Sequence, residues 1–283
     1  NEEYNKFCKL YKEPDMNIRD NASGLTWVVL VILAALPLPV GAQASFTGLG
    51  APAGDESVSV AAQVSANGAA AVGAEKEYDE GVDANVERPI RWMGGQRTVI
   101  PLPADAVGRA GGASVDGATV VGSFIRLDVE NLAVYQEPFR WSENGGLVVL
   151  PMPEGARTSA ATAISADSIT TVGFMDSPDG IQAFRWTQAG GTQGLGFFPD
   201  GIESRALGVS GDGTVIVGFG NHADGIRAFR WTAQDGLVNL GVLQGGTKSR
   251  ASGVSSDGTV VVGGVKDADG KEKAFRWTSQ QGM

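Results

Sequence analysis

Short apolar runs alternate with turn-forming sequences from about residue 45 onward. The pattern is clearest near the C-terminus, where the apolar runs cover 237–243, 250–255, 260–265 and 273–278. Runs of this length are typical of β-strands, and the β-branched run at 260–265 fits a strand that is buried on both faces. No segment has the 3.6-residue period of an amphipathic helix. The pattern therefore predicts four short strands within about 45 residues.

The last of these runs also shows the two-residue period of a strand. Phe275 and Trp277 would lie on one face, and Ala274, Arg276 and Thr278 on the other. Both faces would therefore carry groups that gain from burial. Since a single four-stranded unit cannot bury both of its own faces, we expect neighbouring units to stack.

Three sequence landmarks recur five times along the chain. They are an Arg-Trp pair, a Ser-x-Asp-Gly-like turn, and a Val-Gly pair whose Gly follows the Ser by eight residues in every copy. Fixed spacing across five degenerate copies predicts a repeat architecture. The Arg-Trp pairs are Arg91-Trp92, Arg140-Trp141, Arg185-Trp186, Arg230-Trp231 and Arg276-Trp277. The turns begin at Ser65, Ser114, Ser165, Ser210 and Ser255, and their acidic members are Asp116, Asp167, Asp212 and Asp257.

The landmarks divide residues 45–283 into copies of about 45 residues. The copies span about 45–93, 94–142, 143–187, 188–232 and 233–278, and residues 279–283 would begin a sixth. A four-stranded unit of this length has the dimensions of a propeller blade. We therefore expect an all-β, β-propeller-like array of four-stranded repeats. A β-solenoid is the alternative, although its coils are usually shorter and contain fewer turns.

The repeated pieces resemble a known bacterial family. The Ser-x-Asp-Gly turn, the Val-Val-Gly strand and the Ala-Phe-Arg-Trp-Thr strand are similar to the extracellular repeats called HAF. The resemblance covers about residues 45–283 and is clearest over 143–283, although Gln182, Arg227 and Lys273 stand where the family has its histidine. The resemblance implies export, and some members are joined to an autotransporter domain of the outer membrane. It implies no enzymatic activity.

Residues 16–44 have the pattern of a signal peptide. A short segment with Arg19 precedes an apolar core at 25–36, and Ala42-Gln43-Ala44 offers small residues to a signal peptidase. The core is too short to span the roughly 30 Å of hydrocarbon in a bilayer comfortably. An uncleaved membrane anchor is the alternative. Residues 1–15 contain Cys8 and are expected to be translated upstream sequence or a cloning scar, so the mature repeat domain would cover 45–283.

Composition excludes several function classes. Residues 45–283 carry 18 Lys and Arg against 27 Asp and Glu, whereas nucleic-acid binding needs an excess of cationic groups. His222 is the sole histidine of the chain, and residues 45–283 contain no cysteine. Ser-His and Cys-His triads and zinc sites therefore lack their usual groups. We predict no nucleic-acid partner, no cofactor and no catalytic residue.

Two repeated features offer candidate chemistry. Arg beside Trp could bind a sugar or an anion, but five equivalent positions are typical of packing and of an Arg-to-turn hydrogen bond within or between blades. Acidic turns recur near the third landmark of the last three copies and resemble fragments of a calcium loop, although hairpin turns explain them without a metal. The weak calcium candidates are Asp176, Asp179, Asp224, Asp267 and Asp269.

The first two copies are the most individual, because each has extra residues between Val-Gly and Arg-Trp. The additions centre on the acidic stretch 75–80 and on 124–135. Such insertions often carry binding surface, and a solvated loop is the alternative. We expect an exported interaction module, on the cell surface, secreted or in the periplasm, that binds a glycan or a protein. No membrane span is expected in 45–283 unless a membrane domain follows. A polysaccharide hydrolase with paired carboxylates and a passive spacer are the alternatives.

Overall fold

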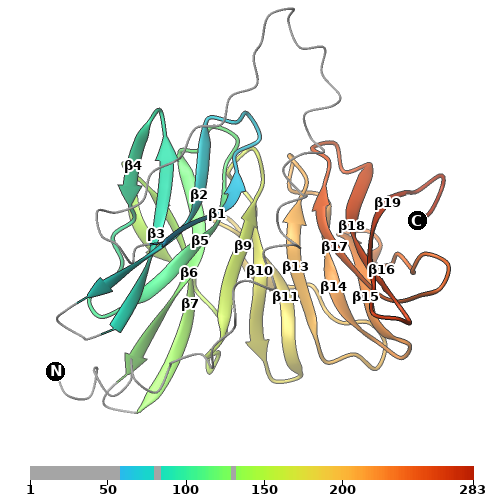
Figure 1. Cartoon of the computed structure of the whole chain (residues 1–283). Helices are drawn as coiled ribbons and strands as arrows, with labels where there is room; N and C mark the ends of the chain where they lie inside the picture. The colour runs from blue at the N-terminus through green and yellow to red at the C-terminus, as the bar shows by residue number, and fades with distance from the viewer. Residues whose placement is uncertain (1–57, 80–83, 129–131) are drawn as a thin grey trace, which may run out of the picture.

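The computed structural model describes residues 58–79, 84–128 and 132–283, and within these ranges the chain forms strands and turns. The strands make five antiparallel sheets that follow one another in chain order, from the sheet of β1–β4 to the sheet of β17–β19 (Figure 1). No helix in the described ranges is long and apolar enough to cross a membrane. The predictions for residues 1–15 and 16–44 lie outside the described residues.

Four of the sheets contain four strands and the last contains three. The first sheet consists of β1 (Val58–Val64), β2 (Ala70–Asp79), β3 (Ala84–Met93) and β4 (Gln96–Val99). The second consists of β5 (Val107–Ala113), β6 (Thr119–Asp128), β7 (Ala133–Ser142) and β8 (Gly146–Val149). The third consists of β9 (Ser159–Ile164), β10 (Thr171–Ser177), β11 (Gly180–Thr187) and β12 (Gly191–Gly194). The fourth consists of β13 (Ser204–Val209), β14 (Ile216–His222), β15 (Gly225–Thr232) and β16 (Gly236–Asn239), and the fifth of β17 (Gly246–Val254), β18 (Val260–Asp267) and β19 (Glu272–Thr278).

These sheets confirm the predicted fold class, an all-β and β-propeller-like array. Consecutive sheets pack face to face, with the first strand of each sheet against the inner strands of the preceding one. Every ladder between named strands is antiparallel and stays within one sheet. A β-solenoid would instead pair strands between successive coils, so that alternative is wrong.

The sheets do not begin where the sequence copies begin. The strand that opens a copy pairs with the last strand of the copy before it: β16, for example, forms its ladder with β15. The apolar run at 237–243 is therefore a strand only as far as Asn239, and the rest connects two sheets. Residues 279–283 likewise turn back onto the fifth sheet, where Gly282 bridges Thr278, and they start that sheet's fourth strand rather than a sixth copy.

The extra residues of the first two copies extend paired strands. β2 and β3 are paired over ten residues, from Ala70 opposite Met93 to Asp79 opposite Ala84. β6 and β7 are paired over the same length, whereas β14 and β15 are paired over seven. Apart from their tips, the two predicted insertions are thus long hairpins rather than solvated loops.

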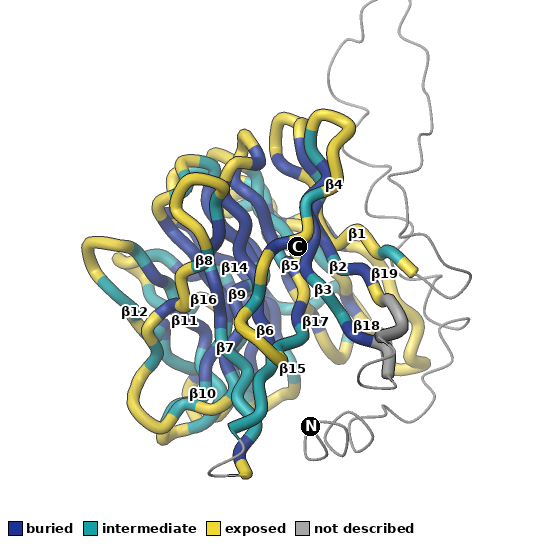
Figure 2. The backbone as a smooth tube through the Cα atoms, turned by 90° about the vertical axis from the view of Figure 1, so that its left-hand side faces the viewer, coloured by how far each residue is buried: buried dark blue, intermediate teal, exposed yellow. Residues whose placement is uncertain are grey.

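The apolar core lies between sheets, and the alternation of side chains explains why. Each sheet has a forward face, which packs on the next sheet in the chain, and a backward face, which packs on the preceding one. At the interface of the third and fourth sheets, Val172 and Ala183 of the forward face meet Ile216, Phe229 and Trp231 of the backward face. Buried segments accordingly fill the middle of the molecule and exposed turns its rim (Figure 2).

A β-bulge explains the repeated Val-Gly pair. In all five sheets the register shifts by one residue where the first strand faces this pair, as between Ala206 and Gly208. The bulge pushes a carbonyl over the glycine, so that a Cβ on Gly218 would lie 1.9 Å from the Arg205 oxygen. For the equivalent glycines of the other four sheets, the distance from an added Cβ to the facing carbonyl oxygen is 1.9 to 2.2 Å. Only glycine fits beside such a bulge without moving the backbone.

Candidate functional site

The Ser-x-Asp-Gly turns form the same hydrogen-bond network in all five sheets. In the fourth sheet, Ser210 Oγ donates to Asp212 Oδ1 at 2.6 Å and accepts the Val215 amide at 2.9 Å, while Asp212 Oδ1 accepts the Thr214 amide. The corresponding Ser-to-Asp distances elsewhere are 2.5 to 3.0 Å, with Asn67 in the first sheet. The serine is buried in the first four sheets. These side chains are therefore committed to closing a hairpin.

The same network acts on the acidic groups. Hydrogen-bond donation from the serine hydroxyl, followed by donation from the backbone two residues on, holds the pKa of Asp116, Asp212 and Asp257 below the ordinary value. Carboxylates in this state accept hydrogen bonds and stay ionised at neutral pH. A general acid needs the opposite shift.

The arginines of the first three Arg-Trp pairs contact the following sheet. Arg91 Nη1 donates to the Gly117 carbonyl in the turn of the next sheet at 3.3 Å, and its guanidinium lies 5.0 Å from the centre of the Trp141 ring. Arg140 makes the same bond to the Ser168 carbonyl, and Arg185 lies over Trp231. Trp141, Trp186 and Trp231 are buried within the inter-sheet clusters. In this position the pair joins one sheet to the next and leaves little surface for a ligand.

The acidic turns close the second hairpin of the last three sheets. Asp176 Oδ2 accepts the Arg157 and Thr158 amides, and Asp267 Oδ1 accepts the Asp269 and Lys271 amides. His222 Nδ1 accepts the Asp224 amide at 3.2 Å. Asp179 and Asp224 are exposed. Within the described ranges these carboxylates do not come together in any group of three or more metal-binding side chains.

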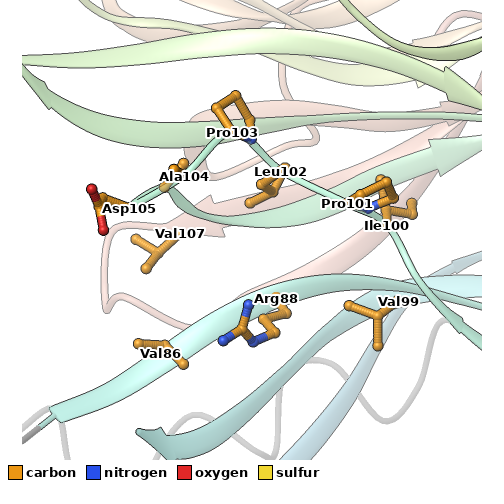
Figure 3. Close-up of a pocket in the computed structure, with 11 residues that line it drawn as sticks. Val86, Arg88, Val99, Ile100, Pro101, Leu102, Pro103, Ala104, Asp105 and Val107 are labelled. Carbon is orange, nitrogen blue, oxygen red and sulfur yellow. The ribbon is translucent and has the colours of Figure 1, made fainter. Parts of the chain in front are cut away.

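A pocket of about 330 Å³ lies between the first two sheets, and sequence reasoning missed it. The segment that connects β4 to β5 arches over it, and the start of β3 forms the opposite side (Figure 3). Arg88 lies between Val86 and Val99, across the opening from Leu102 and Val107 (Figure 3). The full lining is Val86, Arg88, Val99, Ile100, Pro101, Leu102, Pro103, Ala104, Asp105, Ala106 and Val107.

Two backbone hydrogen bonds hold the connecting segment in place. The Ile100 amide donates to the Pro89 carbonyl at 2.9 Å, and the Ala106 amide donates to the Pro103 carbonyl at 3.2 Å. The second bond closes a tight turn in which Asp105 has a φ of 60°, unusual for a residue with a side chain. Prolines at 101 and 103 stiffen the same stretch. The pocket wall is therefore preformed rather than a free loop.

The same position is filled differently between later sheets. Phe198 takes the place of Pro103 in the connection to the fourth sheet, where it is buried with its ring 5.7 Å from that of His222. The residue equivalent to Arg88 in the fourth sheet is Arg227, which donates to the Thr247 carbonyl at 2.8 Å. Proline in place of a bulky side chain and a long hairpin are shared with the second connection, where Pro153 is equivalent to Pro103, but the second sheet has Glu137 at the position of Arg88. Comparing copies position by position could have pointed to Arg88 and Pro103.

The pocket can bind but offers little for catalysis. The ten lining residues other than Arg88 include one carboxylate, that of exposed Asp105, and no aromatic ring. A guanidinium can hold a carboxylate through paired hydrogen bonds, and the aliphatic lining favours an apolar group beside it. Sugar hydrolysis by two carboxylates would need a second acid within about 10 Å, and the lining does not supply one.

The comparisons with known proteins agree with this class of fold. The structure of TolB from Acinetobacter baumannii is 12% identical with a TM-score of 0.54, over 77% of this chain and 52% of that one. A prolyl endopeptidase gives 10% identity and a TM-score of 0.56, over 80% of this chain and 34% of that one. The structure of an oligogalacturonate lyase in complex with manganese gives 14% identity and a TM-score of 0.52, over 78% of this chain and 62% of that one.

These likenesses show the fold alone, because the identities are low. The chain spans about half the length of the TolB structure and about a third of the endopeptidase. No protein-family model matches the sequence, and no curated protein matches it. The fold and the turn network together define a β-propeller-like repeat protein.

Proposed function

We propose that this chain is an exported binding module, placed in the periplasm, on the cell surface or outside the cell, that recognises a protein partner without catalysis. The observation that carries the proposal is the pocket between the first two sheets, with one guanidinium on an otherwise mainly aliphatic lining. The signal-peptide pattern at 16–44 and the resemblance to HAF extracellular repeats support export. The five repeated motifs serve the scaffold, so binding falls to the part that departs from the repeat.

The lining favours a protein over a glycan. Sugar sites commonly present aromatic faces, whereas this pocket has none. An acidic side chain next to an apolar one on a peptide would match Arg88 and the surrounding Val86, Leu102 and Val107. The module would accordingly select peptide segments that combine a carboxylate with a leucine- or valine-like group.

The hydrolase alternative lacks a suitable pair of acids in the described residues near the pocket. Glu75, from the acidic stretch at 75–80, is buried, and both its carboxylate oxygens accept hydrogen bonds from Arg97. Glu87 is paired with Arg109 at 2.8 Å and Lys76 at 3.6 Å. Both carboxylates are thus engaged by basic side chains, and neither is placed to donate a proton to a ligand in the pocket.

A peptide library with acidic and apolar residues, run beside a glycan array and a polysaccharide hydrolysis assay, tests the proposal. We expect acidic-apolar peptides to bind, with no sugar turnover. Arg88→Ala should weaken the best peptide about 10- to 100-fold, the usual loss when a hydrogen bond to a charged group is removed. Gln182→Ala, at the equivalent position of the third sheet, is the matched control and should bind normally. Glycan binding that ignores Arg88, or measurable turnover, would refute the proposal.

A further inference from the structure

An apolar side chain is exposed between two hairpins of the third and fourth sheets. Ile202, in the segment that connects β12 to β13, is 68% exposed. The neighbouring connections have the polar residues Arg157 and Thr247 at the equivalent position, two residues before a buried serine. An isoleucine that remains exposed contributes little to folding, so its side chain is available to cover apolar surface on a partner.

Main-chain hydrogen bonds hold this residue between the two hairpins. The Ile202 carbonyl accepts the Ile181 amide of β11 at 3.1 Å, and the Glu203 carbonyl accepts the Asn221 amide of β14 at 2.8 Å. Gly180, at the tip between β10 and β11, lies so close to the Ile202 carbonyl that no Cβ would fit there. The connecting segment is therefore fixed to both hairpins, and a partner would meet Ile202 on a backbone that is already ordered.

The two hairpins and the connecting segment place three exposed aspartates around this residue. Asp179 lies at the tip between β10 and β11, and Asp224 lies at the tip between β14 and β15, with its side chain 75% exposed. Asp200 is exposed two residues before Ile202, in a turn where its φ is 61°. A partner that covers Ile202 would therefore meet carboxylates from all three segments.

Basic side chains of this chain leave the surface acidic. Neither Asp179 nor Asp200 forms an ion pair with a basic side chain in the described part of the chain. Arg205, three residues after Ile202, is already paired with Glu203, whose carboxylate oxygen lies at 2.7 Å. The surface thus has an apolar centre within an acidic surround, and charge complementarity favours a partner rich in lysine or arginine.

We propose that the surface formed by residues 177–180, 199–203 and 222–225 docks a basic segment of a second polypeptide. Its occupant has a leucine-like residue that covers Ile202, with lysine or arginine on both sides facing the three aspartates. The net charge of −10 argues against a second copy of this chain as the occupant. The surface contains no residue of the pocket, and the proposal does not depend on the function proposed for the pocket.

A fluorescent peptide, titrated with the full chain and followed by anisotropy, tests the proposal. The probe has a pair of leucines between two pairs of arginines, and we expect saturable binding. Ile202→Thr introduces the residue that the next connection has at this position, so the variant should fold normally and bind the peptide about 5- to 10-fold more weakly. The matched control is Ile169→Thr, because Ile169 is 59% exposed at the opposite end of β10, where the next two copies have threonine. Absence of binding, or a loss no greater for Ile202→Thr than for Ile169→Thr, would overturn the proposal.

Removal of charge gives an independent check. Asp179→Asn combined with Asp200→Asn should weaken the peptide about 2- to 10-fold at low ionic strength, the range expected for two surface ion pairs. Asparagine tolerates the positive φ at position 200, so this variant should also fold normally. Added salt should weaken binding to the parent chain and reduce the difference between parent and variant. Equal binding of a peptide with glutamates in place of the arginines, or an unchanged affinity in the double variant, would contradict the proposal.

Discussion

The fourth and fifth sheets have the same motif residues at equivalent positions, but these residues differ in burial. Val217 and Ala228 are fully buried on the forward face of the fourth sheet, while Val262 is 44% exposed and Ala274 is exposed on that of the fifth. On the backward faces, which both have a neighbour, Phe229 and Phe275 are both buried. The difference shows that a residue in this array is buried by the neighbouring sheet rather than by its own. The stability contribution of each motif residue therefore depends on its sheet's place in the array.

The largest difference should come from two glycines at non-equivalent positions: Gly218, which faces the bulge, and Gly264, one place beyond Gly263, the equivalent of Gly218. Gly218→Ala would place a Cβ 1.9 Å from the Arg205 carbonyl, so the bulge or the strand must move, and we expect a loss of at least about 3 kcal/mol of unfolding free energy. Gly264→Ala, in the fifth sheet, meets nothing within 4 Å. It should be neutral or stabilise by up to about 0.5 kcal/mol. Urea denaturation gives the unfolding free energies of both variants. Similar losses of stability for the two variants would contradict this prediction.

The equivalent valines should differ next. Val217→Ala removes two fully buried methyl groups and leaves a cavity between sheets, which should cost about 2 kcal/mol. Val262→Ala removes the same groups from a partly exposed surface and should cost about 0.5 kcal/mol. Thermal and urea unfolding measured in parallel would test this. Equal losses would mean that the forward face of the fifth sheet is covered in solution.

The turn serines should show a smaller difference of the same sign. Ser210→Ala leaves the buried Val215 amide without its hydroxyl acceptor and should cost about 1.5 kcal/mol. Ser255→Ala removes the same bond from a turn that is only partly buried, where water can replace it, and should cost about 0.5 kcal/mol. The unfolding free energies of the two variants, measured at the same pH, test whether Ser210→Ala is the more destabilising. A larger loss for Ser255→Ala would contradict the account.

The smallest effect should appear as a pH dependence common to both sheets. The pKa values of Asp212 and Asp257 are lowered in the folded chain by donation from Ser210 and Ser255. Their contribution to stability is therefore present above the unfolded-state pKa, about 3.9, and is lost as the pH falls through the lower folded-state pKa. Asp212→Asn should be less stable than the parent at pH 7, and the gap should close below about pH 4. A gap that persists into acid would assign the loss to something other than ionisation.

Much of the local structure could be predicted from the sequence, because local rules govern it. The Asp257-Gly258 turn, the alternation of Phe275 and Trp277 with Arg276, and the four-strand unit all follow from short-range pattern. The point along the chain at which each sheet begins and ends could not be predicted in the same way. Whether Gly236–Asn239 pairs with the strand before or after it depends on contacts between separate segments. The role of Gly218 was hidden for the same reason, since the bulge that requires it lies on another strand.

The pocket was beyond sequence reasoning because three segments create it together. Arg88 and Val86 come from β3, Val107 from the next sheet, and Leu102 from the connection between them. None of these residues belongs to a motif. The clue was a departure from the repeat: Pro103 stands where a later copy has the bulky Phe198, and the β2–β3 hairpin is longer than the equivalent hairpins of the last three copies. Departures from the repeat thus indicate which copies differ in structure, whereas the packing of separate segments determines whether a pocket forms there.

Amide hydrogen exchange, sheet by sheet, tests the central claim most directly. The claim is that each sheet is stabilised by the sheets on either side of it. Mass spectrometry of peptides that cover β14–β15 and β18–β19 would compare two hairpins that share the Val-Gly pair and the Ala-Phe-Arg-Trp-Thr segment. The account predicts slower exchange in β14–β15, which has a neighbour on both faces, and faster exchange in β18–β19, which opens first. Equal protection of the two hairpins would contradict it.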